Sequence, residues 1–241
     1  LLATRQIETS KVIKEKKADL GVSFDGDGDR CFFFDNQSEF VPACYITALL
    51  AEYLLKKNPE SKKVILDSRL IWATQEKVEQ AGGKLIVMKA GHSFFKDRMR
   101  KEDALFAGET SGHFFFRDYY YADSGLLPFL LMLELLSQDQ RPFSQILAPL
   151  RQRHPVILET NFSINDTEKL LKIVEGEYGD GEIDHLDGIN AAFKDWRFNL
   201  RGSHNEPLVR LNVEAIDKDV LEKKKAELIS FIQKQGGKLE T

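Results

Sequence analysis

The sequence predicts an α/β domain on a mixed, largely parallel sheet, followed by a smaller α+β domain. Two observations lead to this fold class. Between residues 63 and 107, short apolar runs typical of strands alternate with single amphipathic segments typical of helices. After the prolines between residues 142 and 155, the order changes to a strand, a helix, three closely spaced strands and a charged helix.

The elements before residue 140 follow from apolar spacing and from turn residues. A helix is expected over residues 3–17, where Ile7, Val12 and Ile13 form an apolar stripe. Strands at 19–24 and 31–34 enclose an acidic loop. The later elements are helices at 45–57, 72–80, 94–101 and 124–137 and strands at 63–67, 84–89 and 104–107.

The second domain is expected to contain four strands and two helices. The strands are predicted at 156–162, near 189–193, at 196–201 and at 208–213. One helix begins at Asp166, and the other begins around Lys218 and ends before Gly236.

Composition narrows the class of protein. Of the 241 residues 42% are apolar and 30% are charged, which is typical of a globular protein, and the net charge is −4. The charge argues against a general nucleic-acid or membrane-surface binder. The widely spaced Cys31 and Cys44 favour a reduced, cytoplasmic setting. No apolar run reaches the about 20 residues that a membrane helix needs. The chain starts without Met inside an expected helix, so we expect a fragment of a longer protein.

The acidic loop Asp25-Gly-Asp27-Gly-Asp29-Arg30 follows a hydrophobic strand. Three alternating carboxylates repel one another unless a hard cation such as Mg²⁺ neutralises them. An EF-hand is excluded because Arg30 and Asn36 occupy its sixth and twelfth positions. A haloacid-dehalogenase-type phosphatase is a better alternative, with Asp25 as nucleophile and Asp27 as acid/base. That alternative expects Thr or Val where Asp29 stands.

Two further loops carry polar side chains at regular intervals. Glu109, Ser111 and His113 alternate along the segment 108–113, so an extended loop would place them on one face, where they suit the vicinal hydroxyls of a sugar. The segment 201–207, followed by Arg210, offers a guanidinium, a hydroxyl, an amide and turn N–H groups. These are the parts of a phosphate cradle, with candidate side chains Arg201, Ser203, Asn205 and Arg210.

In this order, the three loops resemble the motifs of the C-terminal portion of the α-D-phosphohexomutases of the phosphomannomutase/phosphoglucomutase type. The acidic loop is similar to the family's metal loop, and residues 108–113 match its Gly-Glu-x-Ser-Gly-His sugar loop. Residues 89–92 resemble its Lys-Thr-Gly-His turn, with Ala90 as a departure. Residues 201–207 resemble its Arg-x-Ser-Asn-Thr-Glu-Pro phosphate loop, with His204 and Asn205 as departures.

The resemblance implies a role for each residue of the site. Mg²⁺ would be bound by the three aspartates, and Arg30 would lie near the transferring phosphate. His92 would contact substrate or assist proton transfer, and Arg69 stands where relatives have a Lys near the active site. Glu109, Ser111 and His113 would hold the sugar, and the 201–210 residues its non-reacting phosphate.

The resemblance also implies domains and a reaction. Residues 1–32 would end a second domain, 33–148 form the third and 149–241 the fourth, with the N-terminal domains of the same chain as the missing partner. A phosphoserine outside this chain would convert a hexose monophosphate to a bisphosphate and then be rephosphorylated, so the fragment is expected to be inactive alone. Thr110 favours mannose or glucose over glucosamine. A non-catalytic sugar-phosphate-binding module and the phosphatase remain alternatives.

Overall fold

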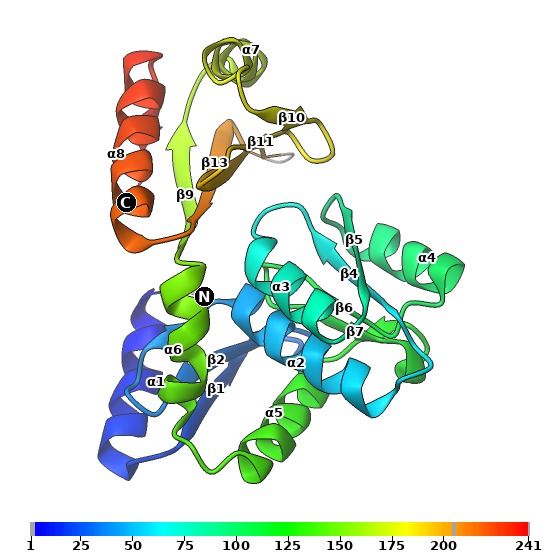
Figure 1. Ribbon diagram of the computed structural model, residues 1–241. Helices are drawn as coiled ribbons and strands as arrows, with labels where there is room; N and C mark the ends of the chain where they lie inside the picture. The colour runs from blue at the N-terminus through cyan, green and yellow to red at the C-terminus, as the bar shows by residue number, and fades with distance from the viewer. Residues whose placement is uncertain (1–2, 204–205, 241) are drawn as a thin grey trace. The chain divides into compact units, whose positions relative to one another are not determined.

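The structure, a computed structural model, describes residues 3–203 and 206–240 (Figure 1). The described chain divides into two compact units. One contains residues 3–67 and 73–149, and the other contains residues 68–72 and the rest from residue 150 onward. The first holds the alternating helices and strands and the second an antiparallel sheet with helices, so the predicted fold class is confirmed. The expected boundary at residue 32, inside the first unit, stays a prediction.

The first unit opens with a helix and a small antiparallel sheet in the order β1-β2-β3. The bounds are α1 (Ala3–Lys16), β1 (Leu20–Phe24), β2 (Cys31–Asp35) and β3 (Phe40–Val41), and they agree with the expected helix and strands. The acidic loop is the connection between β1 and β2, which pair from Phe24↔Cys31 to Leu20↔Asp35. A hairpin therefore holds both ends of this loop.

A five-stranded sheet, β5-β4-β6-β7-β8, forms the rest of the first unit. Its elements are α2 (Ala43–Lys57), β4 (Lys63–Asp67), α3 (Trp72–Gln80), β5 (Lys84–Met88), α4 (His92–Glu102), β6 (Phe106–Gly108), β7 (Phe114–Phe116), η1 (Arg117–Tyr119), β8 (Ala122–Asp123) and α5 (Leu126–Gln138). The sheet is mixed, as predicted, but it is not largely parallel. β4 pairs in parallel with β5 and β6, whereas β7 and β8 are antiparallel. The five residues between β6 and β7 are too few for a crossover, so the chain reverses.

Helices cover both faces of this sheet (Figure 1). On one face, Phe95 and Met99 of α4 pack against Ile65 and Ala107. On the other, α2 lies against Gly108, where a Cβ would fall 2.3 Å from Oγ1 of Thr47. This close approach of helix and strand therefore requires a glycine at the end of β6.

The helix α6 (Phe143–Arg153) occupies the proline-rich stretch where the sequence did not indicate a helix. Pro149 lies inside it and costs about 3 kcal/mol relative to an ordinary helical residue. The side chains of Phe143, Leu147 and Leu150 are buried at helical spacing. Their burial, at about 1.5–3 kcal/mol for each side chain, outweighs the cost of the proline.

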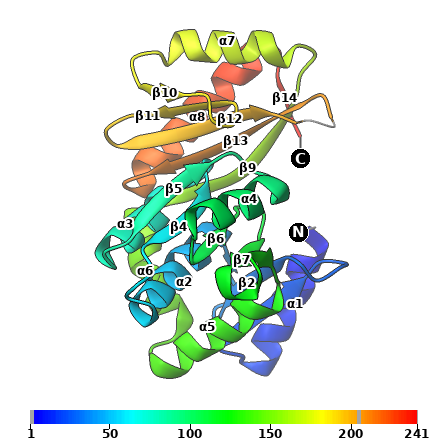
Figure 2. The same cartoon turned by 90° about the vertical axis from the view of Figure 1, so that its right-hand side faces the viewer.

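The second unit is an antiparallel six-stranded sheet in the order β10-β11-β12-β13-β9-β14 (Figure 2). Its elements are β9 (Val156–Ser163), α7 (Thr167–Glu177), β10 (Glu182–Asp184), β11 (Ile189–Ala192), β12 (Trp196–Gly202), β13 (Leu208–Ala215), α8 (Lys218–Lys234) and β14 (Lys238–Leu239). The side chains of Asp166 and Asp217 cap the two helices by accepting hydrogen bonds from Lys169 N and Val220 N. The predicted strands and helices are present. Two short strands that were not predicted, β10 and β14, form the edges of the sheet.

The sheet of the second unit has one apolar and one polar face. Side chains of α7 and α8 pack in one core with alternate residues of β12 and β13, such as Phe198 and Leu211. The intervening residues form cross-strand pairs on the opposite face, namely Arg197↔Glu214, Asn199↔Asn212 and Arg201↔Arg210. Because strand side chains alternate between faces, one polar row extends along the sheet and ends at Arg201 and Arg210.

The buried ion pair of Arg197 and Glu214 fixes the segment 68–72. The two side chains are 4% and 1% exposed and lie 2.7 Å apart. Arg197 also donates to the carbonyls of Ser68 and Arg69, and the Glu214 carboxylate accepts from the backbone N–H groups of Ile71 and Trp72. These bonds explain why a segment between β4 and α3 belongs to the second unit.

No described helix is both long and apolar enough to cross a membrane. Cys31 and Cys44 are buried, and no disulfide is formed in the described part of the chain. Burial raises the pKa of the Cys31 thiol to about 12. The thiol is therefore protonated at neutral pH, so this cysteine is not a reactive nucleophile.

Arg197→Met is expected to lower the free energy of unfolding of the second unit by about 3–5 kcal/mol, because it leaves Glu214 buried without its cation. Urea denaturation followed by tryptophan fluorescence reports on this unit, which contains both tryptophans, Trp72 and Trp196. The control is Lys225→Met at an exposed pair with Glu222, expected to shift stability by less than about 0.5 kcal/mol. Equal stability of the two variants would contradict the prediction.

Candidate functional site

The acidic loop brings its three carboxylates together. One oxygen from each of Asp25, Asp27 and Asp29 lies within 4.8 Å of the others. Gly28 has φ 76°, a left-handed conformation that glycine adopts without steric cost, and it turns the chain between the last two aspartates. The convergence of hard oxygen donors on one small volume suits a divalent cation.

The carboxylates of Asp25 and Asp29 differ in how much positive charge and how many hydrogen-bond donors surround them. Asp25 accepts hydrogen bonds from Nε of Arg30, at 2.5 Å, and from the backbone N–H of Arg30. Burial acts to raise the pKa of Asp25, but these bonds from Arg30 outweigh it and lower the pKa. For Asp29, burial raises the pKa, aided by the charges of Asp25, Asp27 and Asp123 and opposed by His113. Oδ1 of Asp29 is buried and has no hydrogen-bond partner among the described residues. This oxygen has only the longer ion pairs with His113 and Arg30, at 3.5 and 3.9 Å. Together with the all-carboxylate donor set, it fits Mg²⁺.

The carboxylate of Glu109, a residue only 4% exposed, organises the neighbouring loop. Oε1 accepts a hydrogen bond from Gly91 N at 2.8 Å. Oε2 lies 3.2 Å from Ser111 Oγ and 3.0 Å from Nδ1 of His113, and the latter two atoms are 2.9 Å apart. The three alternating side chains therefore share one face and contact one another.

Contacts with two neighbouring segments, the end of β4 and the start of β2, fix the loop 109–113 in place. The carboxylate of Asp67, at the end of β4, accepts hydrogen bonds from the backbone N–H of Thr110, at 2.5 Å, and from its hydroxyl, at 3.0 Å. An antiparallel bridge joins Arg30 to His113, and Cys31 N donates to Gly112 O at 3.1 Å. The acidic loop and residues 109–113 therefore form one backbone-linked site within the first unit.

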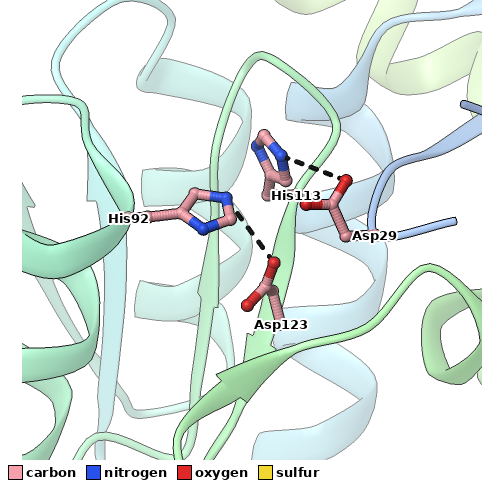
Figure 3. A group of neighbouring side chains, drawn as sticks. All are labelled: Asp29, His92, His113 and Asp123. Carbon is pink, nitrogen blue, oxygen red and sulfur yellow. Dashed lines mark ion pairs between the residues drawn. The ribbon is translucent and has the colours of Figure 1, made fainter. Parts of the chain in front are cut away.

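A pair of histidines meets a pair of aspartates beside the acidic loop (Figure 3). His92, the first residue of α4, lies edge-on to His113, with ring centroids 4.2 Å apart. Nε2 of His92 is 3.5 Å from Oδ2 of Asp123, and Nε2 of His113 is 3.5 Å from Oδ1 of Asp29. Lys96 binds the other oxygen of Asp123 at 2.7 Å. Although burial raises the pKa of Asp123, Lys96 and His92 lower it below its usual value.

The start of α5 limits the space around the acidic loop. A Cβ at Gly125, the residue before this helix, would lie 2.5 Å from the carbonyl oxygen of Gly28 and 3.0 Å from that of Arg30. Backbone atoms cannot move aside as a flexible side chain can. The loop therefore keeps its position only because a glycine stands at this helix start.

In the second unit, two predicted phosphate ligands lie side by side. Arg201 and Arg210 are cross-strand neighbours, and the Glu159 carboxylate contacts both, at 3.0 and 3.1 Å. Ser203 follows β12, and its backbone N–H donates to Leu208 O. Asn205, also predicted as a ligand, and its neighbour His204 lie outside the described residues. Arg69 is buried in the second unit, where its carbonyl accepts from Arg197.

Sequence reasoning missed four residues of these sites. Asp67 had a usable signal, because a carboxylate ending a parallel strand lies at the edge where α/β folds place their sites. For Asp123, Lys96 and Glu159 the sequence carried no signal that marks them as site residues. The first two depend on how β8 pairs with β7, and Glu159 depends on the register between β9 and β13.

Comparisons with known proteins all give matches to phosphohexose mutases. Residues 44–154 match the protein-family model described as "Phosphoglucomutase/phosphomannomutase, alpha/beta/alpha domain III". Over 97% of its length the chain is 44% identical to "Phosphohexose mutases" of Xanthomonas campestris pv. campestris. Over 98% it is 42% identical to a phosphomannomutase of Vibrio cholerae. The alignments cover 52% and 51% of these relatives, so the chain spans about half of their length.

The fold gives the same result. A crystal structure of a phosphoglucomutase/phosphomannomutase family protein from Burkholderia thailandensis superposes with a TM-score of 0.82 at 28% identity. The match covers 98% of this chain and 52% of that protein.

Gly125→Ala is expected to weaken binding of a divalent cation to the acidic loop by about tenfold, or about 1.4 kcal/mol, because the new methyl group displaces the backbone of Gly28 and Arg30. Mn²⁺ binding, followed by electron paramagnetic resonance, measures the effect. The control is Gly26→Ala in the loop itself, where a Cβ meets nothing within 4 Å. Equal Mn²⁺ affinity of the two variants would show that the contact with α5 does not control the loop.

Proposed function

Because this chain belongs to the α-D-phosphohexomutase superfamily, we propose that it supplies the metal, sugar and phosphate loops of an enzyme that interconverts hexose 1-phosphate and hexose 6-phosphate. The reaction is an intramolecular phosphotransfer through a phosphoserine and a hexose bisphosphate. The single observation that carries this proposal is the backbone link between the three-aspartate loop and the Glu109–His113 loop. It supports a phosphoryl site and a hydroxyl-binding site side by side in one unit.

The metal loop is proposed to bind Mg²⁺ through Asp25, Asp27 and Asp29. When bound, Mg²⁺ would neutralise charge on the oxygens of the transferring phosphoryl group. Arg30, which the structure holds against Asp25, adds a fixed guanidinium at the same place. Its hydrogen bond to Asp25 uses Nε, so this bond leaves the terminal nitrogens of Arg30 available for phosphate oxygens.

The sugar hydroxyls are proposed to bind at Glu109, Ser111 and His113. Glu109 and Ser111 together can accept and donate, which is what a pair of vicinal hydroxyls needs. His92 lies beside His113 and is 38% exposed at its side chain, so it is the candidate for proton transfer to and from a hydroxyl. The Thr110 hydroxyl bonds to Asp67, so this residue would affect the choice among mannose, glucose and glucosamine through the shape of the loop.

A phosphate group is proposed to bind at the loop 201–207 of the second unit, with Arg201 and Arg210 as its cations. Nε of each guanidinium is buried without a hydrogen-bond partner among the described residues. Glu159 now balances both cations, so phosphate must compete with this carboxylate. The Glu159 carboxylate between the two arginines therefore lowers their affinity for phosphate.

The complete gene product, with Mg²⁺ and a catalytic amount of glucose 1,6-bisphosphate, is expected to convert mannose 1-phosphate or glucose 1-phosphate to the 6-phosphate. Phosphorus NMR distinguishes the two esters from inorganic phosphate in one measurement. Release of inorganic phosphate without isomerisation would support the phosphatase alternative. Binding of the sugar phosphates without any turnover would support a non-catalytic module, and either outcome would overturn the mutase proposal.

Substitutions of Arg201 and of its partner Glu159 are expected to have opposite effects on substrate binding. Arg201→Met should raise KM by about 10–100-fold with a smaller effect on kcat, because a charge-assisted hydrogen bond contributes about 1.5–3 kcal/mol. Glu159→Gln should lower KM, because it removes the carboxylate that competes with phosphate. Steady-state kinetics of both variants test this, with Arg100→Met, on the exposed side of α4, as the control. An unchanged KM in Arg201→Met would remove the phosphate loop from the proposal.

A further inference from the structure

The segment 67–72, which joins β4 to α3, contains residues of both units. Asp67 ends β4 in the first unit, and residues 68–72 are part of the second. The buried carboxylate of Asp67 accepts hydrogen bonds from Thr110, 2.5 Å from its backbone nitrogen and 3.0 Å from its hydroxyl. A single peptide bond therefore separates the residue that holds the loop 109–113 from the first residue that the second unit holds.

Arg197 of β12 holds the first two residues of this segment in the second unit. Its guanidinium donates to the carbonyl oxygen of Ser68 at 2.8 Å and to that of Arg69 at 3.1 Å. It also donates to the Asn190 amide oxygen at 3.3 Å. A planar guanidinium has several N–H groups in fixed directions, so it can bind two successive carbonyls at once. One buried side chain therefore fixes the backbone directly after Asp67.

Glu214 of β13 holds the other end of the segment. Its carboxylate accepts hydrogen bonds from the backbone N–H groups of Ile71 and Trp72, at 2.8 and 3.0 Å. These donors lie at the start of α3, where a helix leaves its first N–H groups without intrahelical partners. Arg197 lies 2.7 Å from Glu214 and neutralises it. The ion pair therefore holds residues 68–72 at both ends.

We propose that Arg197 and Glu214 are positioning residues for the loop 109–113 and, through Thr110, affect which hexose is selected. By holding residues 68–72 they fix the backbone that follows Asp67, and the Asp67 carboxylate then holds Thr110. Hydrogen bonds and one peptide bond make this path continuous, so a change at the ion pair reaches the loop. The effect on hexose selection rests on the proposed function, whereas the positioning of the loop does not.

Hydrogen exchange at the Thr110 amide, followed by NMR, tests this link without turnover. In the 241-residue chain, Arg197→Lys keeps a cation beside Glu214, but an ammonium group lacks the planar fork that binds two carbonyls. The protection of the Thr110 amide is expected to fall at least about tenfold, because the backbone after Asp67 is no longer held and the loop opens more often.

Ser68→Gly tests the same link from the backbone. It keeps the carbonyl that Arg197 binds, and the Ser68 hydroxyl has no hydrogen-bond partner among the described residues, so the change mainly adds backbone freedom. Protection at Thr110 should fall at least about threefold. The matched control is Leu228→Ala, which leaves a cavity in the core of the second unit and should leave Thr110 protection unchanged.

Kinetics of the complete gene product test the effect on hexose selection. Arg197→Lys should change the ratio of the kcat/KM values for mannose 1-phosphate and glucose 1-phosphate at least about threefold, because Thr110 shapes the loop. Leu228→Ala should lower both values to the same degree, as a loss of stability alone would.

Three results would overturn the proposal. They are unchanged Thr110 protection in both Arg197→Lys and Ser68→Gly, an equal loss of protection in Leu228→Ala, and an unchanged kcat/KM ratio in Arg197→Lys. A gene product without mutase activity would overturn the proposed function instead, and the exchange experiment would still decide the positioning role.

Discussion

A carboxylate withdrawn from water must be hydrogen-bonded or paired, and this requirement at Glu109 organises the first unit's site. Its two oxygens reach Gly91 before α4 and the side chains of Ser111 and His113 in the loop that ends β6. One buried group therefore contacts the start of a helix, the side chain of a loop serine and the ring of a histidine. The side chains proposed to hold the sugar are positioned by their contacts with one another, before any ligand is present.

The acidic loop depends on the same arrangement through its backbone. The bridge between Arg30 and His113 joins it to the Glu109 loop, and the glycine at the start of α5 lets the helix approach from another side. These backbone constraints hold three carboxylates together against their mutual repulsion. Asp29, whose pKa is raised by burial, faces His113 and so lies where the acidic loop meets the Glu109 loop.

In the second unit, strand pairing brings two like charges together. Arg201 and Arg210 are directly opposite each other, an arrangement of like charges that is unfavourable unless an anion lies between them. Glu159 provides that anion from the neighbouring strand. Farther along the same polar face, Arg197 and Glu214 neutralise each other and bind the backbone of residues 68–72. The same row of residues therefore contains a buried ion pair and, farther along, a pair of cations that one carboxylate neutralises.

The sequence by itself determined most of the helices and strands. It also showed which residues make up the three polar loops. Period and turn residues located β4 and α3 at their observed bounds, and the alternation of Asp25, Asp27 and Asp29 indicated a cation site. It did not indicate α6, where buried apolar side chains outweigh a proline, or the antiparallel half of the five-stranded sheet. Only the tertiary structure placed Asp123 beside His92, Lys96 beside Asp123, and Glu159 between two arginines. Local patterns record periodicity and spacing along the chain, whereas these contacts depend on which strands pair and in which register, and that is decided by packing between distant segments.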